Sequence, residues 1–156
     1  EKWPYKFTLS EIQCGAGIVM MKKLDKLNNI RIIRAKKFIK SLSSFSELNF
    51  NKSFKNKSHV YHLLSAYYLP SKKINRNILI KKLYESYKIK CAVQYYPLYK
   101  YSLFKKMGFG KGKCLNTEKF YNNMISFPFH VWMTSNQFNY MISSVKKVLL
   151  ELRELR

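Results

Sequence analysis

Acidic residues are scarce in this sequence. Only 8 of its 156 residues are Asp or Glu, and they are scattered from Glu1 to Glu154. No two of them form a carboxylate pair of the kind that glycosidases use. No cysteine or carboxylate lies near His59 and His62 in sequence to complete a tetrahedral metal site. The sequence therefore predicts neither a carboxylate-pair hydrolase nor a metal centre.

Cysteine is also rare, and long apolar runs are missing. Cys14, Cys91 and Cys114 are odd in number and far apart, which favours free thiols over a disulfide framework. No run approaches the roughly 18 apolar residues of a membrane span. The N-terminus shows no signal-peptide pattern. We therefore expect a protein of the reducing cytoplasm without a membrane partner.

Basic residues are abundant instead. The chain carries 30 Lys and Arg, which gives a formal charge of +22. One interpretation is a phosphate-rich partner. The other is compositional drift, because Lys, Asn, Ile, Tyr and Phe are enriched together, as in proteins of AT-rich genomes. The basic residues are spread along the whole chain, which favours drift. A nucleotide-sugar substrate would need only a few of these charges.

A long helix is predicted at the start of the chain, from residue 8 to about residue 42. Thr8 and Glu11 have the spacing of a capping box. A helix of about 33 residues would be roughly 50 Å long, more than a chain of this size needs for one globule. It is therefore expected to span between two bodies. Its apolar residues recur at helical spacing: Ile12, Ala16, Val19, Met20, Leu24, Leu27 and Ile30.

The remaining elements are predicted from apolar periodicity and from residues that begin or end helices and strands. Strands are predicted at 48–50, 59–69 and 90–96, the last ended by Pro97. Helices are predicted at 74–87, 101–107 and from Asn116 to 124. An extended segment at 126–130 leads to a terminal helix that opens on a second capping box. That box is formed by Thr134 and Gln137. The order of strands and helices indicates a single α/β domain behind the long helix.

Tyrosines cluster in the segment 94–101, beside Lys100. Aromatic rings next to a positive charge can stack on a nucleotide base or on single-stranded nucleic acid. The same rings can instead pack at the rim of a core, with their hydroxyls in water. The composition of the segment leaves both interpretations open.

An ordered series of segments covers nearly the whole chain: Tyr5 to Gln13 with Gly17 and Lys22 to Asp25, His59 to Leu63, Tyr84 to Tyr99, Asn116 to Glu118, Ser126 to Phe129, and the helix from Thr134. In this order, the segments resemble motifs of the DegT/DnrJ/EryC1/StrS family of sugar aminotransferases. The resemblance corresponds to roughly the C-terminal two-fifths of such an enzyme.

The resemblance implies a type I aminotransferase fold, of which this chain would be the C-terminal small domain. Residues 1–42 would form a loop and the inter-domain helix. Residues 43–156 would form a small sheet flanked by helices. The chain does not begin with Met, and a helix is predicted close to its first residue, which is consistent with a fragment of a longer protein.

The family's chemistry implies a cofactor, a substrate class and a partner. Its members use pyridoxal 5'-phosphate to move an amino group, usually from glutamate, to a keto-sugar attached to a nucleotide. They act as homodimers. The lysine that holds the cofactor would lie upstream of residue 1, so no catalytic residue is expected within this chain. The chain alone is expected to be inactive.

Four residues of this chain take positions that contact ligands in the family. Lys6 replaces an asparagine that reaches across the dimer to the cofactor phosphate, and a lysine can still pair with phosphate as a point charge. Thr8 stands where the family has a substrate-contacting arginine. Gln94 replaces the histidine of a His-Tyr pair, and Tyr95 keeps its tyrosine. A second histidine of the same motif, outside these four positions, is replaced by Tyr99. Gln94 keeps hydrogen-bonding ability but cannot titrate.

Other functions stay open at this stage. The charge and the tyrosines would suit a nucleic-acid-binding module, which is the less favoured interpretation. An inactive remnant of a truncated gene is another. A non-catalytic regulator with an aminotransferase-like fold is the last.

Overall fold

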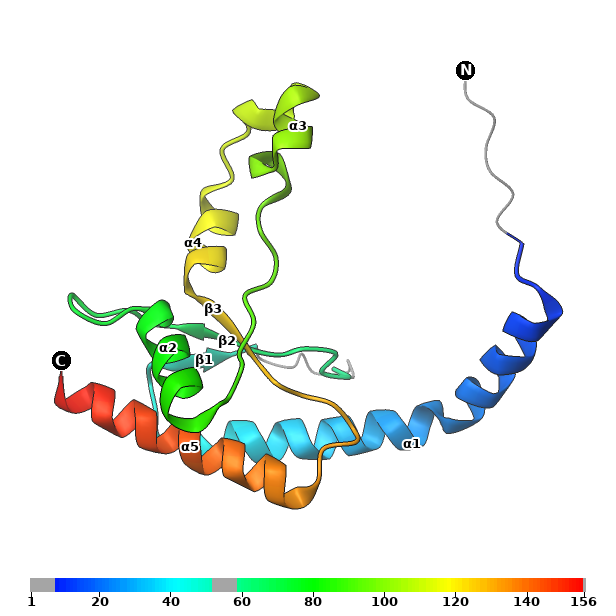
Figure 1. Cartoon of the computed structure of the whole chain (residues 1–156), viewed down its shortest axis with the longest axis horizontal. Helices are drawn as coiled ribbons and strands as arrows, with labels where there is room; N and C mark the ends of the chain where they lie inside the picture. The colour runs from blue at the N-terminus through cyan, green and yellow to red at the C-terminus, as the bar shows by residue number, and fades with distance from the viewer. Residues whose placement is uncertain (1–7, 52–58, 156) are drawn as a thin grey trace.

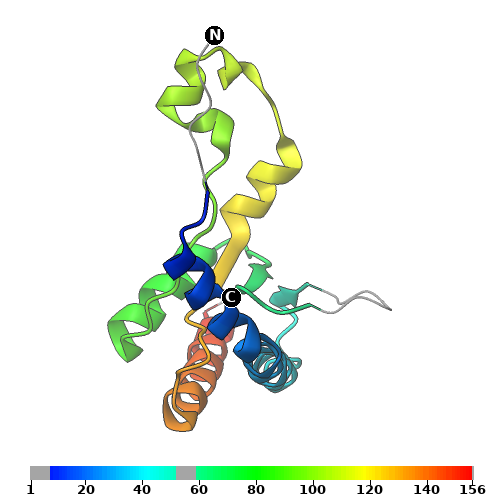
Figure 2. The same ribbon diagram turned by 90° about the vertical axis from the view of Figure 1, so that its right-hand side faces the viewer.

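The architecture is a small antiparallel sheet covered by helices on one side, with a long helix projecting from the body (Figures 1 and 2). The computed structural model describes residues 8–51 and 59–155. The strands are β1 (Leu48–Phe50), β2 (Leu64–Tyr68) and β3 (Met124–Phe127), in the order β1-β2-β3. The α-helices are α1 (Glu11–Ser41), α2 (Arg76–Tyr87), α3 (Ser102–Lys106), α4 (Leu115–Asn123) and α5 (Ser135–Glu154). Two short 3-10 helices, η1 (Leu98–Lys100) and η2 (Phe109–Lys111), flank α3.

The long helix α1 is confirmed, but its predicted start is wrong. Ser10, not Thr8, is the N-cap, and its hydroxyl accepts a hydrogen bond from the Gln13 amide at 3.3 Å. The Gln13 side chain accepts in return from the Ser10 amide at 2.9 Å. Two overlapping patterns of the same kind occur in this stretch, because both Thr8 and Ser10 are followed three residues later by Glu or Gln.

The sheet differs from the prediction in its third member. The strand β1 is confirmed at Leu48–Phe50. The predicted strand at 59–69 is wrong in its first half, because Tyr61 has a φ of 50°, and β2 begins only at Leu64. The predicted strand at 90–96 is also wrong. Within it only Ala92 pairs, in a single bridge to Ser126, and β3 takes the place beside β2.

The helices that follow agree with the predictions except at their ends. Asn75 caps α2, which therefore begins two residues later than predicted. The short helix α3 is confirmed inside the predicted range. Asn116 does not cap α4, because the helix already begins at Leu115 after Cys114. The terminal capping box of Thr134 and Gln137 is confirmed in both directions.

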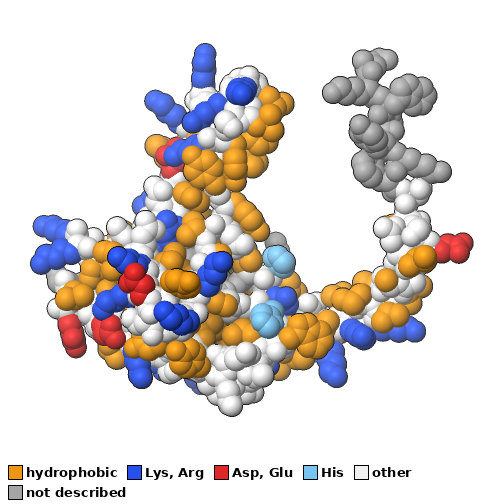
Figure 3. All heavy atoms as spheres, viewed as in Figure 1, with side chains coloured by type: hydrophobic (Ala, Val, Ile, Leu, Met, Phe, Trp, Pro, Cys, Tyr) orange, Lys and Arg blue, Asp and Glu red, His pale blue; other side chains and the backbone are white. Residues whose placement is uncertain are grey.

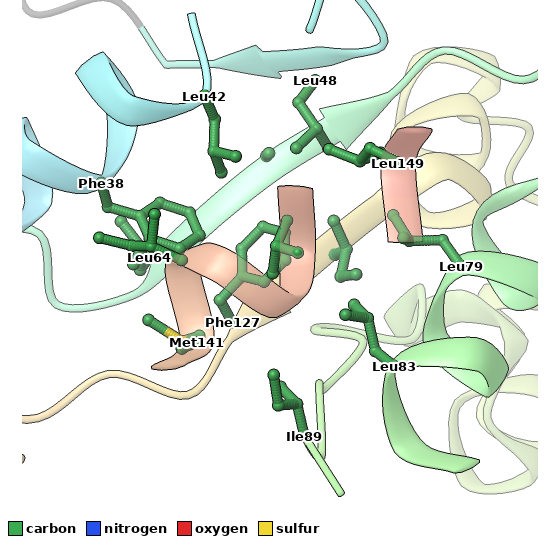
Figure 4. Close-up of a cluster of buried hydrophobic side chains, with 14 of the residues drawn as sticks. Phe38, Leu42, Leu48, Leu64, Leu79, Leu83, Ile89, Phe127, Met141 and Leu149 are labelled. Atoms are coloured by element: carbon green, nitrogen blue, oxygen red, sulfur yellow. The ribbon is translucent and has the colours of Figure 1, made fainter. Parts of the chain in front are cut away.

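The core lies between the sheet and the helices α1, α2 and α5 (Figure 4). Alternate residues of β2 point into it, and Leu64, Ala66 and Tyr68 are all buried. Phe38 of α1 is completely buried and contacts the rings of Phe50, Phe127 and Phe138. The C-terminal part of α1 therefore belongs to the same core as the sheet, and a domain boundary at residue 42 stays a prediction.

The N-terminal half of α1 has a different environment. Side chains from Glu11 to Lys26 are exposed, whereas Ala35 and Phe38 are buried. Figure 3 shows hydrophobic side chains along this projecting half. The predicted apolar stripe therefore exists, but its first half is not covered by any other described part of the chain. The exposed large apolar residues here are Leu9, Ile12, Ile18, Val19, Met20, Met21 and Leu24.

An ion pair between the exposed Arg153 and the buried Glu47 ties α5 to the turn before β1. The Arg153 guanidinium donates to both carboxylate oxygens of Glu47, at 2.6 and 2.9 Å, and to the Ser44 carbonyl at 2.9 Å. Its plane also lies over the Phe45 ring. Glu47 is buried, so the bidentate arginine supplies the charge partner that a buried carboxylate needs.

The described part of the chain contains no helix that is long and apolar enough to cross a membrane. All three cysteines are free, as predicted. Cys14 and Cys114 are exposed, whereas burial raises the pKa of the Cys91 thiol to about 12.

These thiols should react at two distinct rates. At neutral pH, Ellman's reagent should modify Cys14 and Cys114 rapidly. Cys91 should react at least about 100-fold more slowly, because the thiolate is the nucleophile and its population at Cys91 is very small. The release of thionitrobenzoate measures both phases. Cys91→Ser should remove only the slow phase. Three equivalent fast thiols would contradict the burial of Cys91.

Candidate functional site

The segment that holds Gln94 runs beside β3, on the edge away from β2. Ala92 and Ser126 exchange two backbone hydrogen bonds, of 2.9 and 2.8 Å. Two residues further on, the backbone amide of Gln94 donates to the sulfur of Met124 at 3.1 Å. The Gln94–Tyr95 peptide bond is cis. The segment is therefore fixed to β3 at two points, although it is not a full strand.

This arrangement places Gln94 on the sheet face that the core helices do not cover. Residues that pair across antiparallel strands share a face, and so do residues two positions apart. Ala92, Gln94 and Ser126 therefore lie on one face. Ile125 and Phe127 lie on the other face, where they join the core. We call the first of these faces the open face.

A half-open crevice of about 150 Å³ lies at this position. Gln94 and Ser126 line it, and so do Lys90 and His62, both of which are exposed residues. The rest of the lining is apolar. Lys90 gives the crevice a positive charge, and no carboxylate contributes to its lining among the described residues. The crevice thus offers hydrogen-bonding groups within an apolar surround.

The two tyrosines after Gln94 differ in their surroundings: one is available for ligand stacking and the other packs against neighbouring rings. Tyr95 is 69% exposed. Tyr96 instead packs edge-on against the rings of Tyr101 and Tyr121, with ring centroids 5.0 and 5.5 Å apart. Tyr95 is therefore free to contact a ligand, whereas Tyr96 supports the local packing.

Beyond Tyr96 the chain forms an arm that projects from the body and returns along α4 (Figure 1). We define the arm as residues 98–123, which include η1, α3, η2 and α4. Three side chains connect its outgoing and returning halves. The Tyr99 hydroxyl donates to one oxygen of Glu118 at 2.7 Å, and the Lys100 ammonium pairs with the other at 2.8 Å.

The contacts of Glu118 shift two pKa values in opposite directions. The hydrogen bond from Lys100, and then that from Tyr99, lower the pKa of the Glu118 carboxyl. Desolvation and the hydrogen bond to Glu118 raise the pKa of Tyr99 to about 12. Because the pKa of Glu118 is lowered in the folded state, its contribution to stability is present above the ordinary carboxyl pKa. It is lost as the pH falls through the lowered value.

Loosening this connection should make the arm easier to cleave. At neutral pH, Glu118→Gln removes the charge that Lys100 pairs with. Trypsin should then cut at Lys105, Lys106 and Lys111 roughly two- to fivefold faster, as expected for a partly exposed ion pair. Mass spectrometry of a timed limited digest measures the rates.

Glu85→Gln is the matched control, because Glu85 forms a more exposed ion pair with Lys81 in α2 at 3.9 Å. It should leave cleavage of the arm unchanged. Equal cleavage rates in the Glu118→Gln and unsubstituted chains would show that the ion pair does not hold the arm.

The structure does not gather all four predicted ligand-contacting residues. Gln94 and Tyr95 are adjacent at the open face. Thr8 is exposed and precedes the free end of α1, which projects away from the sheet (Figure 1). Lys6 lies outside the described residues, so its role stays a prediction. Thr8 and Gln94 therefore do not share a cleft within one chain.

The metal expectation and a missed residue complete the description of the site. No group of three His, Cys, Asp or Glu side chains suited to a metal is found among residues 8–51 and 59–155. The Nδ1 atom of His59 accepts from the Tyr61 amide at 2.8 Å, so it serves the local turn. Ser126 is not among the predicted site residues, because its motif, Ser126 to Phe129, indicates an extended apolar segment and no ligand contact.

Comparison with known proteins supplies the family. The DegT/DnrJ/EryC1/StrS aminotransferase family matches residues 1–146. The chain belongs to this family. The fold agrees with that of an aminotransferase from Psychrobacter cryohalolentis, which superposes with a TM-score of 0.87 at 16% identity. The superposition covers 98% of this chain and 42% of that one. The chain thus has the α/β fold of a partial aminotransferase, as the resemblance implied.

One curated relative is a sugar transaminase. The chain is 27% identical over 154 residues to the UDP-4-amino-4,6-dideoxy-N-acetyl-beta-L-altrosamine transaminase of Campylobacter jejuni. The match covers 96% of this chain and 39% of the relative. The chain therefore spans about two-fifths of the length of this aminotransferase.

The family is dependent on pyridoxal phosphate. NtdA of Bacillus subtilis, which was solved with the cofactor PMP bound, superposes with a TM-score of 0.74 at 20% identity, over 89% of this chain and 32% of that one. Such sites need a lysine and a partner for the pyridine nitrogen. The crevice at Gln94 has Lys90 at its rim and no carboxylate among its described lining residues. This crevice therefore does not form a cofactor pocket by itself.

Proposed function

We propose that this chain is the small-domain part of an aminotransferase that uses pyridoxal phosphate. The enzyme would transfer an amino group, with glutamate as the expected donor, to a nucleotide-linked keto-sugar. The observation that carries the proposal is the family match over residues 1–146, together with a sheet whose open face holds Gln94. When bound, the cofactor supplies the electron sink for amino-group transfer.

The chain's own residues would bind and orient the substrate. Gln94 lies in the half-open crevice and offers an amide that can donate and accept. Tyr95 is exposed beside it and offers a ring face for the nucleotide base or sugar. The arm, fixed by Glu118, would limit the access of water to this side of the site. None of these groups transfers a proton in the proposal.

Thr8 and Lys6 would act on a second copy of the chain. The free end of α1 carries Thr8 away from its own open face. A homodimer would therefore be needed to bring Thr8 to a substrate and Lys6 to the cofactor phosphate. The two exposed thiols, Cys14 and Cys114, suit the reducing cytoplasm. We propose that location, and no nucleic-acid partner, for the enzyme.

The complete gene product that contains this chain provides the test. It should bind pyridoxal phosphate, seen by visible absorption, and convert a UDP-linked 4-keto sugar with glutamate into an amino sugar, seen by mass spectrometry. The 156-residue chain alone should do neither. Failure of the complete product to bind the cofactor would overturn the proposal and favour a remnant. Binding to generic DNA with a steep salt dependence would favour the nucleic-acid interpretation.

A further inference from the structure

Two buried polar atoms at the open face have no hydrogen-bond partner among the described residues. They are the Oε1 atom of Gln94 and the hydroxyl oxygen of Ser126. Ser126 is 4% exposed. A buried polar group without a partner costs roughly 1–3 kcal/mol. Such groups are few in folded proteins, so each needs an explanation.

The two side chains belong to one place in the fold. Ser126 pairs with Ala92, and Gln94 follows two residues later on the same face. Both residues line the same crevice, between the segment 90–94 and the residues that precede β2. Their backbones are fixed there by the Ala92–Ser126 hydrogen bonds and by the bond from the Gln94 amide to Met124. The pair is therefore prepositioned.

We propose that Gln94 and Ser126 together bind one hydroxyl group of a sugar ring, which adds Ser126 to the substrate-contacting residues. This inference rests on the proposed function and deepens it. The ligand's hydroxyl donates to the Oε1 atom of Gln94 and accepts from the hydroxyl of Ser126. A hydroxyl satisfies both atoms because it donates and accepts at once.

The surroundings favour a neutral, hydroxyl-bearing ligand. Apart from Lys90 and His62 at the rim, the remaining lining is apolar: Leu63, Leu64, Ala92, Phe127, Pro128 and Phe129. Apolar walls with a few fixed polar groups are typical of small-molecule sites, where the walls bury a ring and the polar groups orient it. Lys90 can in addition contact an anionic group attached to the ring.

The inference makes a two-sided prediction for Ser126→Ala. In the free chain this change removes an unpartnered hydroxyl, so the midpoint of thermal unfolding should rise. Sugar binding should fall at the same time. A serine with a merely structural role would show the opposite stability effect, because its removal would break a bond.

D-glucose is the probe, because the natural sugar is unidentified. Saturation-transfer NMR detects its ring protons and tolerates self-association of the chain. We expect a glucose signal with the unsubstituted chain and a several-fold weaker one with Ser126→Ala and with Gln94→Met. Ser143→Ala is the matched control, since Ser143 is exposed on α5, and it should leave the signal unchanged. Tetrahydropyran, which has the ring without hydroxyls, should respond equally in all variants.

Three results would overturn the inference. One is a glucose signal that Ser126→Ala leaves unchanged, and another is no glucose signal at all. The third is a lower unfolding midpoint in Ser126→Ala. Cofactor binding by the complete gene product tests the proposed function separately. If the complete gene product binds the cofactor but the glucose signal does not depend on Ser126, the transaminase proposal stands and this subsite is refuted. If the glucose signal depends on Ser126 but the complete gene product does not bind the cofactor, only the sugar subsite stands.

Discussion

Phe38→Ala should destabilise the chain by about 3–5 kcal/mol, the largest loss that we expect from a single substitution. Phe38 is 0% exposed, and its ring contacts the rings of Phe50, Phe127 and Phe138. Truncation removes the buried ring and leaves a cavity between α1, the sheet and α5, and such changes cost this much in well-packed cores. Urea unfolding followed by circular dichroism measures the change in free energy.

Ile33→Ala is the matched control on the same helix. Ile33 is 67% exposed, so its truncation should change the free energy of unfolding by less than about 0.5 kcal/mol. Similar losses for the two variants would contradict the packing of α1 described above. A small loss in Phe38→Ala would mean that α1 does not dock on the sheet through this ring.

The 156-residue chain by itself should self-associate at micromolar concentration. Seven large apolar residues are exposed on the projecting half of α1 and just before it. Complete burial of one such side chain contributes roughly 1.5–3 kcal/mol. Their sum exceeds a cost of association of about 4–15 kcal/mol only if most of them become covered together. A helix-to-helix contact between two chains would cover them in this way.

Sedimentation velocity provides the measurement. Simultaneous Ile12→Gln, Val19→Gln and Met20→Gln should weaken the association by more than about 100-fold, which corresponds to roughly 2.8 kcal/mol. The control carries Leu150→Gln and Leu155→Gln, which alter exposed leucines at the other end of the chain. It should associate like the unsubstituted chain. A clean monomer at micromolar concentration in the unsubstituted chain would refute the prediction.

Local signals in the sequence were enough for most helices. The capping box of Thr134 and Gln137 predicted the start of α5 because its two hydrogen bonds involve only neighbouring residues. The same rule misplaced the start of α1, where the pattern occurs twice and Ser10, with an extended backbone, is the N-cap. Local rules therefore identify a helix more reliably than they choose between adjacent caps.

The third strand could not be predicted, because pairing is a tertiary property. Residues 90–96 alternate in type as a strand does. Yet beyond Ala92 the Gln94 amide meets the Met124 sulfur instead of a carbonyl, and Pro97 has no amide to donate. The ladder ends after one bridge. The segment 124–127, predicted only in part as extended, becomes β3 because its alternate residues fill the core.

Only some residues of the candidate site could be predicted from the sequence. Gln94 and Tyr95 came from a motif, and the structure places them at the open face. Ser126 belongs to a matched motif, but the sequence did not predict a ligand contact for it, because its burial without a partner arises only when segments 34 residues apart in sequence meet at Ala92. The sequence shows which polar groups a residue carries, whereas only the folded structure shows which of these groups are buried without a hydrogen-bond partner.

The attachment of α1 at one end turns its other half into a lever. Its C-terminal part is held by Phe38 in the core and by Arg31, which donates to the Tyr61 and His62 carbonyls. From Arg31 the first turn lies about 30 Å away at 1.5 Å per residue. A tilt of about 10° there would swing that turn by roughly 5 Å. Small repacking of the attached part therefore sets where the far tip of the helix points, and with it the reach of Thr8.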